Sequence, residues 1–212
     1  EAGLRTRDTI RYTMVFTIPC AVGMAALARP IMMMLYGNND SLALAAGIMQ
    51  SGALLTVLLA LSTLTTGILQ GLGEMQAPLV HAATAVAIHL GFLVLFVVKF
   101  KWNIYGVVYA NIIFGLIICL LNARSIRKKL HYRQEIKKTF LVPVIAAGVM
   151  GIAAYLVHRV FNLFAGNTIS TILAVCVGAV CLVKLGGILE REIRRLPKGD
   201  LLADLLIRLN IL

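Results

Sequence analysis

Several polar side chains stand inside or near the ends of long apolar runs, and their types could bind a ligand, pass an ion or move a proton: His89, Arg29, Gln50, Asn111 and Lys184. Ionisable groups in such runs are costly and therefore tend to mark functional sites. His89 is the best candidate for facing a polar cavity or accepting a proton, with a histidine held by packing as the open alternative. Gln50 and Asn111 are typical of hydrogen bonds between helices. Arg29 suits a helix cap or an anionic headgroup, and the long stem of Lys184 favours reaching the headgroups over a buried role.

The sequence shows none of the patterns of an enzyme. It has no His, Cys and carboxylate cluster at metal-ligand spacing, no Gly-x-Ser-x-Gly and no phosphate-binding loop. The acidic residues lie in predicted loops, at the ends or in the tail, so no pair of carboxylates is placed for acid–base chemistry. Cys20, Cys119, Cys176 and Cys181 sit in apolar runs and indicate packing. We expect no catalytic residue, metal or cofactor. Coupling of the protein's activity to a proton or sodium gradient stays open.

Composition places the chain in a membrane. Of its 212 residues, 60% are hydrophobic and 14% are charged, and the mean hydropathy is +0.91. Soluble domains are roughly 45–50% apolar and about 25% charged. The net charge of +11 could suit nucleic acid. The basic residues, however, gather in short segments between apolar runs, as in cytoplasmic loops of membrane proteins, so we expect no nucleic-acid partner.

The apolar runs predict an all-α, polytopic membrane helix bundle with six transmembrane helices. The predicted spans run from about Tyr12 to Ala28, Leu44 to Leu72, Pro78 to Val98, Tyr105 to Leu121, Phe140 to Val160 and Thr168 to Leu189. A break at Arg29-Pro30, a short apolar piece at Ile31–Tyr36 and a loop at Gly37–Ser41 should follow the first span. Leucines at helical spacing in Glu190–Leu212 predict a C-terminal amphipathic helix lying on the membrane.

A tight hairpin is predicted at Gly67–Pro78, between the second and third spans. Gly67, Gly71 and Gly73 are expected to end the incoming helix, because glycine adopts the positive φ of a helix C-terminus without strain. Pro78 is expected to open the outgoing helix, where a missing N–H costs nothing. The two helices should therefore pack antiparallel. In the fifth span, a stripe of small residues predicts close helix packing: Ala147, Gly148, Gly151 and Ala154.

The basic residues predict the orientation and the domain division. Of the 20 Lys and Arg, 15 fall on one side of the predicted spans and 4 on the other, with Lys184 inside a span. The side richer in positive charge is the cytoplasmic one, so both termini and the Gly67–Pro78 hairpin should be cytoplasmic. We divide the chain into four spans (1–121), a basic cytoplasmic loop (122–139), a pair of spans (140–189) and the amphipathic tail (190–212).

Three stretches resemble the flippases of the multidrug/oligosaccharidyl-lipid/polysaccharide (MOP) superfamily. Thr17-Ile-Pro-Cys-Ala-Val-Gly23, with Leu27-Ala-Arg-Pro-Ile31 and Leu35-Tyr-Gly37 after it, resembles their ninth span. The Gly67–Pro78 hairpin is similar to their connection between spans ten and eleven. Leu196-Pro-Lys-Gly199 is similar to the C-terminus of the stage V sporulation protein B and polysaccharide biosynthesis protein branch, which is related to lipid II flippases. The likeness runs in order along essentially the whole chain.

This resemblance implies the C-terminal part, spans nine to fourteen, of a fourteen-span protein in the bacterial cytoplasmic membrane. Such a protein flips a lipid-linked oligosaccharide or peptidoglycan precursor by alternating access, for polysaccharide, cell-wall or spore synthesis. The implied partners are membrane lipid, the lipid-linked sugar substrate and the N-terminal spans of the same protein, and a chain opening at Glu1 is expected to lack them. The resemblance carries no substrate-binding residue onto this chain. The alternatives are a fragment of a cation-coupled multidrug (MATE-type) exporter and a non-transporting membrane scaffold or decayed fragment.

Overall fold

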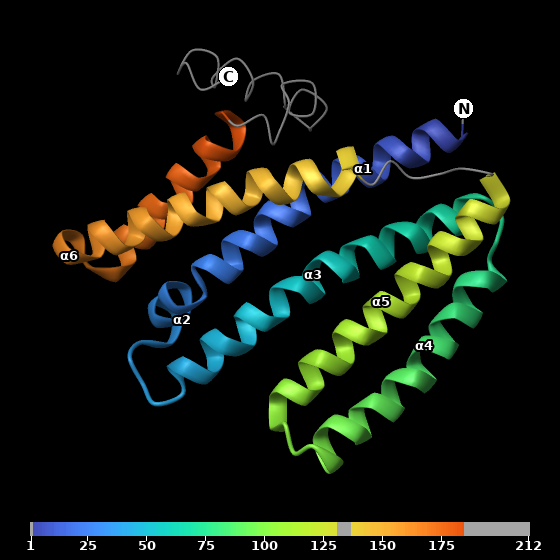
Figure 1. Ribbon diagram of the computed structural model, residues 1–212, viewed down its shortest axis with the longest axis horizontal. Coiled ribbons are helices and arrows are strands. Elements are labelled where there is room, and N and C mark those ends of the chain that lie inside the picture. Colours follow the sequence, from blue (N-terminus) through green and yellow to red (C-terminus); the bar gives the residue numbers. More distant parts are fainter. Residues whose placement is uncertain (1, 131–136, 185–212) are drawn as a thin grey trace. The chain divides into compact units, whose positions relative to one another are not determined.

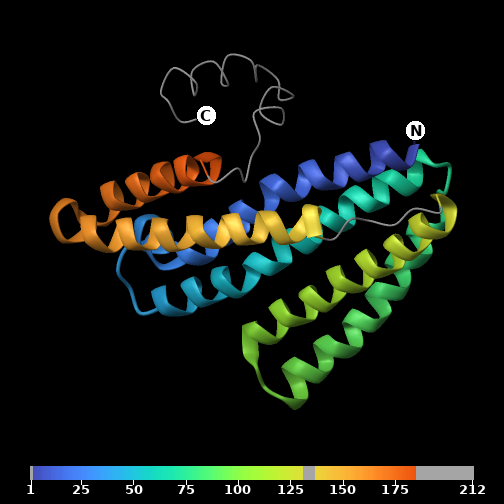
Figure 2. The same cartoon turned by 45° about the horizontal axis from the view of Figure 1, so that its top comes forward.

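The computed structural model describes residues 2–130 and 137–184, and these residues form helices joined by short connections, with no strand (Figure 1). In chain order the elements are α1 (Ala2–Ala26), α2 (Ala28–Tyr36), α3 (Leu42–Gly71), α4 (Gln76–Val94), the π-helical turn η1 (Leu95–Lys99), α5 (Asn103–Leu130), a second π-helical turn η2 (Lys137–Leu141) and α6 (Val142–Lys184). Gly166, with φ 74° and ψ 170°, breaks α6 into two helices that run back along each other (Figure 2). The all-α prediction is confirmed.

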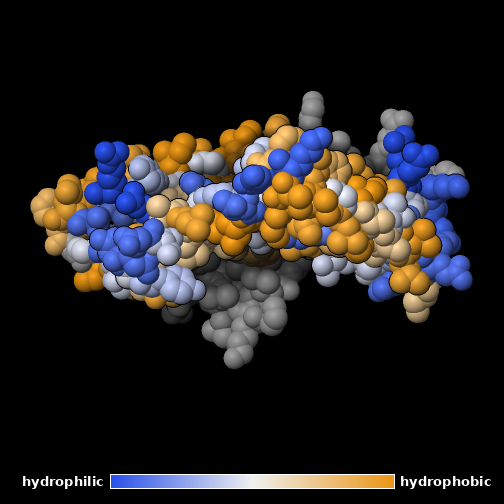
Figure 3. Space-filling model, turned by 90° about the horizontal axis from the view of Figure 1, so that it is seen from below, coloured by the Kyte–Doolittle hydropathy of each residue, from blue (hydrophilic) through white to orange (hydrophobic). Residues whose placement is uncertain are grey.

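Over the described ranges, six helices are long and apolar enough to cross a membrane: Arg5–Ala26, Leu42–Gly71, Gln76–Lys99, Asn103–Leu130, Thr139–Phe164 and Gly166–Val183. Large apolar side chains face outward along them, including Leu79, Leu120 and Ile152, each more than 60% exposed. Apolar side chains accordingly cover broad areas of the face seen in Figure 3. A surface of this kind is stable against lipid, so the chain is a multi-pass membrane protein, as predicted.

The chain forms two compact units, and α1 and α3 contribute to both. The first unit comprises residues 1–13 and 51–135, and the second comprises residues 14–50 and 136–212. The first therefore holds most of α3 together with α4, η1 and α5, and the second holds α2, α6 and the C-terminal half of α1. These units are not the segments into which the sequence was divided above.

In the first unit, α5 packs closely on both α3 and α4. A Cβ on Gly115 would lie 3.0 Å from the Cβ of Leu58, which shows how near α5 comes to α3. The thiol of Cys119 also donates to the carbonyl oxygen of Leu58 at 3.3 Å. Cys119 is therefore a packing residue, as the sequence indicated. α4 and α5 form an antiparallel hairpin (Figures 1 and 2).

In the second unit, small residues let α6 approach α1 and fold back on itself. A Cβ on Gly151 would lie 2.8 Å from Cγ1 of Val22, closer than side chains tolerate. Gly178, on the returning helix, faces Met150 and Ala154 at ordinary contact distance. Ala147 and Ala154 are fully buried. The predicted stripe of small residues thus packs closely, with the exception of Gly148, which has open space beside it.

The predicted Gly67–Pro78 hairpin is present, and its geometry explains where α3 ends. Gly73 has φ 80°, the N–H of Glu74 donates to the carbonyl oxygen of Leu69 at 2.9 Å, and the N–H of Gly73 donates to that of Gln70 at 3.0 Å. These are the two hydrogen bonds of the Schellman motif. Gly67 and Gly71 lie inside α3, and α4 begins at Gln76, so Pro78 occupies its third position rather than its first.

Three predicted boundaries are wrong in detail. The break after α1 falls at Leu27, and Arg29 and Pro30 already lie in the first turn of α2. Residues 122–130 are the last turns of α5 and not a loop, because helical hydrogen bonding continues past the apolar stretch into the basic residues. The interval left between the predicted fifth and sixth spans, 161–167, is helical except for a break at Gly166. The amphipathic tail, 190–212, lies outside the described residues.

Candidate functional site

A cavity of about 720 Å³ in the second unit is lined by polar side chains from α2, α3 and α6. It is lined by the end of α1, by α2, by the start of α3 and by the two halves of α6 around Gly166. Its cationic and hydrogen-bonding side chains are Arg29, Gln50, Tyr155, His158, Arg159, Asn162 and Asn167. Alanines, Met33 and Leu163 complete the wall, so the lining joins charged, amide and apolar groups.

Asn167 organises the closed side of this cavity. Its Nδ2 donates to the carbonyl oxygen of Pro30 at 2.9 Å, and its Oδ1 therefore accepts from His158 Nε2 at 3.1 Å. His158, which is only 9% exposed, is thus fixed with its Nε2 protonated. The positive φ of Gly166 turns the chain so that Asn167 faces His158 nine positions earlier. One amide thereby joins α2 to both halves of α6.

Gln50 closes the end of α1. Its Nε2 donates to the carbonyl oxygen of Ala25 at 3.2 Å. Ala25 lies in the last turn of α1, where carbonyl oxygens have no partner within the helix. This hydrogen bond between α3 and α1 is the role predicted for Gln50, a link between helices.

Arg29 and Arg159 give the cavity its charge. Both side chains are exposed, and no carboxylate belongs to the described lining. Asp40 is the one acidic residue in the described ranges of this unit, 14–50 and 137–184, and it is not part of the wall. Two guanidinium groups in one cavity wall without a counter-charge can pair with an anion, because planar guanidinium groups match the oxygens of carboxylates and phosphates.

The residues singled out from the sequence are only partly brought together. Arg29 and Gln50 share the cavity. His89 is in the first unit, where its ring packs edge-on against Phe114 at 5.6 Å and its buried Nδ1 has no hydrogen-bond partner among the described residues. Asn111 lies half-buried on α5 in the first unit and is not among the residues that line the cavity. Lys184 ends α6, and its side chain lies outside the described part.

Sequence reasoning missed His158 and Asn167. Both stand at the predicted boundary between the fifth and sixth spans, and nothing local indicates that they meet. The signal available was Gly166 between two apolar runs, since a glycine in that place allows a one-residue reversal that brings the flanking helix ends together.

The first unit holds a second polar cluster, centred on Asn122, which is 0% exposed. Its Nδ2 donates to Oγ1 of Thr65 at 3.1 Å and of Thr66 at 3.0 Å, so its Oδ1 accepts from His81 Nδ1 at 2.8 Å. Ser125 Oγ lies 3.3 Å from His81 Nε2 and supplies the remaining hydrogen bond. This network links α3, α4 and α5, and every polar group named here has a partner.

A surface ion pair closes the same end of that unit. Lys129 Nζ lies 2.5 Å from Glu74 Oε1, which joins the end of α5 to the connection between α3 and α4. The hydrogen bond from Lys129 and its positive charge lower the pKa of Glu74 below the ordinary value of 4.5, against a small opposing effect of desolvation. The basic end of α5 thus contains one cation that already has an anionic partner.

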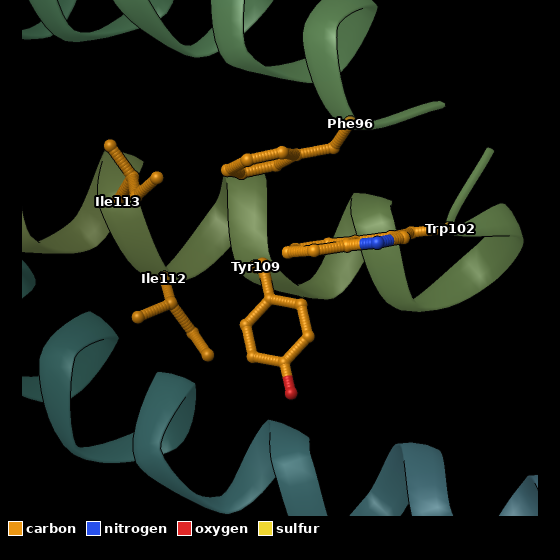
Figure 4. Close-up of a pocket in the computed structure, with 5 residues that line it drawn as sticks. All are labelled: Phe96, Trp102, Tyr109, Ile112 and Ile113. Atoms are coloured by element: carbon orange, nitrogen blue, oxygen red, sulfur yellow. The ribbon is translucent and has the colours of Figure 1, made fainter. Parts of the chain in front are cut away.

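An aromatic pocket of about 440 Å³ lies at the opposite end of the α4–α5 hairpin, lined by Phe96, Trp102, Tyr109, Ile112 and Ile113. The rings of Phe96 and Trp102 lie nearly parallel with centroids 5.1 Å apart, and Tyr109 meets Trp102 edge-on at 5.7 Å (Figure 4). The two isoleucines lie across from the stacked rings on α5.

The chain matches no protein-family model, no curated protein and no solved structure. The functional argument therefore depends on the residues of the cavity, the polar network and the aromatic pocket.

Proposed function

We propose that this chain is the C-terminal portion of a transporter that flips a lipid-linked oligosaccharide or peptidoglycan precursor across the bacterial cytoplasmic membrane by alternating access. The observation that carries the proposal is the cavity of the second unit, with two arginines, amides and apolar residues in one wall. A lipid-linked sugar has the matching parts: a phosphate-bearing link, hydroxyl groups and a hydrocarbon tail. A soluble anion would need no apolar wall.

The distribution of basic residues supports an orientation for this transporter. With both termini cytoplasmic, the basic end of α5 and the Asn122 network face the cytoplasm, and Arg29 and Arg159 stand at the outer ends of their spans. The cavity would then hold the charged part of the substrate on the outer side. The N-terminal spans of the same protein would supply the rest of the pathway, and a proton or sodium gradient would supply the driving force.

The charge of the cavity disfavours the exporter alternative. A cation-coupled drug exporter must accommodate positive substrates or ions, which are held by carboxylates or by carbonyl oxygens. The described lining presents two guanidinium groups instead. Like charges would repel a cationic drug from this wall, so an anionic substrate fits it better.

The test is a flipping assay on the complete protein that carries this chain, in cells depleted of their own flippase. We expect Arg29→Gln with Arg159→Gln to reduce the fraction of precursor reaching the outer leaflet by about tenfold or more, since charged hydrogen bonds are each worth roughly 1.5–3 kcal/mol. Arg29→Lys with Arg159→Lys should retain part of the activity. Arg124→Gln, at the exposed basic end of α5, is the matched control. Normal flipping by the double glutamine variant, at equal membrane abundance, would refute the proposed role of the cavity.

A further inference from the structure

The aromatic pocket of the first unit has a lining suited to hydrocarbon. Its described wall consists of aromatic rings and two isoleucines, and its polar groups are the Trp102 indole N–H and the Tyr109 hydroxyl. In Figure 4 the Tyr109 hydroxyl points away from Phe96 and Trp102. A sugar would need several converging donors and acceptors, whereas a flexible acyl chain needs only apolar contact.

The pocket is built by specific backbone features. A Cβ on Gly106 would lie 3.1 Å from the Cβ of Phe96, so glycine is what lets η1 rest on α5. The N–H of Trp102 donates to the carbonyl oxygen of Phe96 at 3.1 Å. Lys101 and Asn103, neither of them glycine, adopt φ of 53° and 48°. A strained turn of this kind persists only where its surroundings hold it, which makes the ring arrangement a defined one.

Lys99 and Lys101 lie close in sequence to the pocket residues Phe96 and Trp102, and no acidic residue lies near them along the chain. Lys99 and Lys101 are exposed, and the acids nearest along the chain are Glu74 and Glu135. Lys99 also ends the apolar span Gln76–Lys99, so both lysines stand at the depth of lipid headgroups. Exposed lysines that adjoin the residues of an apolar pocket in sequence are complementary to a lipid with a negative headgroup.

We propose that this pocket binds one acyl chain of an anionic phospholipid, whose phosphate lies against Lys99 and Lys101. This site is separate from the cavity of the second unit and does not depend on the function proposed for it. Aromatic residues at a membrane interface can also act as anchors that contact any lipid in turn. A specific site differs from such an anchor in two measurable ways, because it prefers anionic lipid and it saturates.

The chain offers a built-in probe, because Trp102 is its only tryptophan. Bromine atoms on an acyl chain quench indole fluorescence on contact. We would reconstitute the 212-residue chain in phosphatidylcholine and titrate brominated phosphatidylglycerol or brominated phosphatidylcholine. The expected result is half-maximal quenching at a roughly thirtyfold lower mole fraction for the anionic lipid, because each of the two lysines contributes about fivefold near a charged surface. Equal quenching by both lipids, rising without saturation, would overturn the proposal.

Paired variants separate the charge from the pocket. Lys99→Gln with Lys101→Gln should abolish the preference for the anionic lipid, and Arg124→Gln with Arg127→Gln, at the other end of α5, should leave it intact. Gly106→Ala should weaken quenching by displacing Phe96. Gly91→Ala is its control, since a Cβ at Gly91 meets nothing within 4 Å. Loss of the preference in the α5 control, or full quenching in Gly106→Ala, would contradict the assignment.

Discussion

Each unit contains a histidine that is hydrogen-bonded to an asparagine, but one of these clusters is buried and the other borders a cavity. In the first unit, Asn122 is fully buried and satisfies His81 and two threonines. In the second, Asn167 binds both His158 and the first turn of α2, but the arginines of the same wall face a cavity. The same residue types thus form a buried hydrogen-bond network between helices in one unit and part of a cavity wall in the other.

The two clusters differ in whether each polar or charged group has a hydrogen-bond partner or a counter-charge. Around Asn122 the amide group and the imidazole of His81 are hydrogen-bonded to side chains on neighbouring helices, and Lys129 is paired with Glu74. Around Asn167 the hydrogen bonds fix the frame, while the positive charge of Arg29 and Arg159 has no carboxylate within the described wall. A satisfied cluster stabilises packing, and an unbalanced one is left available to a ligand.

The largest expected effect comes from Asn122→Ala. This change removes three hydrogen bonds between helices and leaves the partners of Asn122 buried without it, so we expect the free energy of unfolding to fall by about 2–3 kcal/mol. Reversible unfolding in mixed micelles measures it. Asn162→Ala, on the exposed wall of the cavity, should change the same quantity by less than about 0.5 kcal/mol. Similar losses at both positions would show that the two clusters do not differ as described.

Gly151→Ala tests whether the second unit depends on the close approach of α6 to α1. The new Cβ would lie 2.8 Å from Cγ1 of Val22, a stiff β-branched side chain, so α1 must move away from α6. We expect a loss of about 1–2 kcal/mol in the free energy of unfolding. Gly148→Ala adds the same methyl group where nothing lies within 4 Å and should be nearly neutral. Equal stability of the two variants would argue against the described approach of α1 and α6.

Asn162→Asp should give the arginines of the cavity wall a counter-charge, as Lys129 has in the first unit. It places a carboxylate in the wall that contains Arg29 and Arg159 and gives their charge a partner. We expect binding of a fluorescent polyprenyl phosphate to weaken about tenfold, while stability changes by less than about 1 kcal/mol because the pair is exposed. Asn162→Ser is the neutral control. Unchanged binding in the aspartate variant would mean that the arginines do not attract the anion.

The sequence was most informative where the physics is local. Span number follows from apolar length, and the Gly67–Pro78 hairpin follows from the conformational freedom of Gly73. Helix ends were less predictable: α5 runs on to Leu130 because its hydrogen bonding does not stop where the apolar residues stop. The site was least predictable. Arg29 and Gln50 stood out as polar residues in apolar surroundings, but their meeting with His158 and Asn167 is a tertiary event. His89 drew attention for the same reason and lies against Phe114 instead.

The smallest expected effect is a dependence of the first unit's stability on acid. Because Lys129 lowers the pKa of Glu74 in the folded chain, the charged carboxylate stabilises the fold above its unfolded pKa, near 4.5, and that contribution is lost as pH falls through the folded value. We expect the melting temperature of the wild-type chain to fall slightly further than that of Glu74→Gln between pH 6 and the acid limit of the assay. The difference should shrink in high salt, because both side chains are exposed and the pair is screened. If the two chains lose stability in parallel, the Lys129–Glu74 pair does not balance the charge at this end of α5, and the contrast with the cavity then depends on the Asn122 network alone.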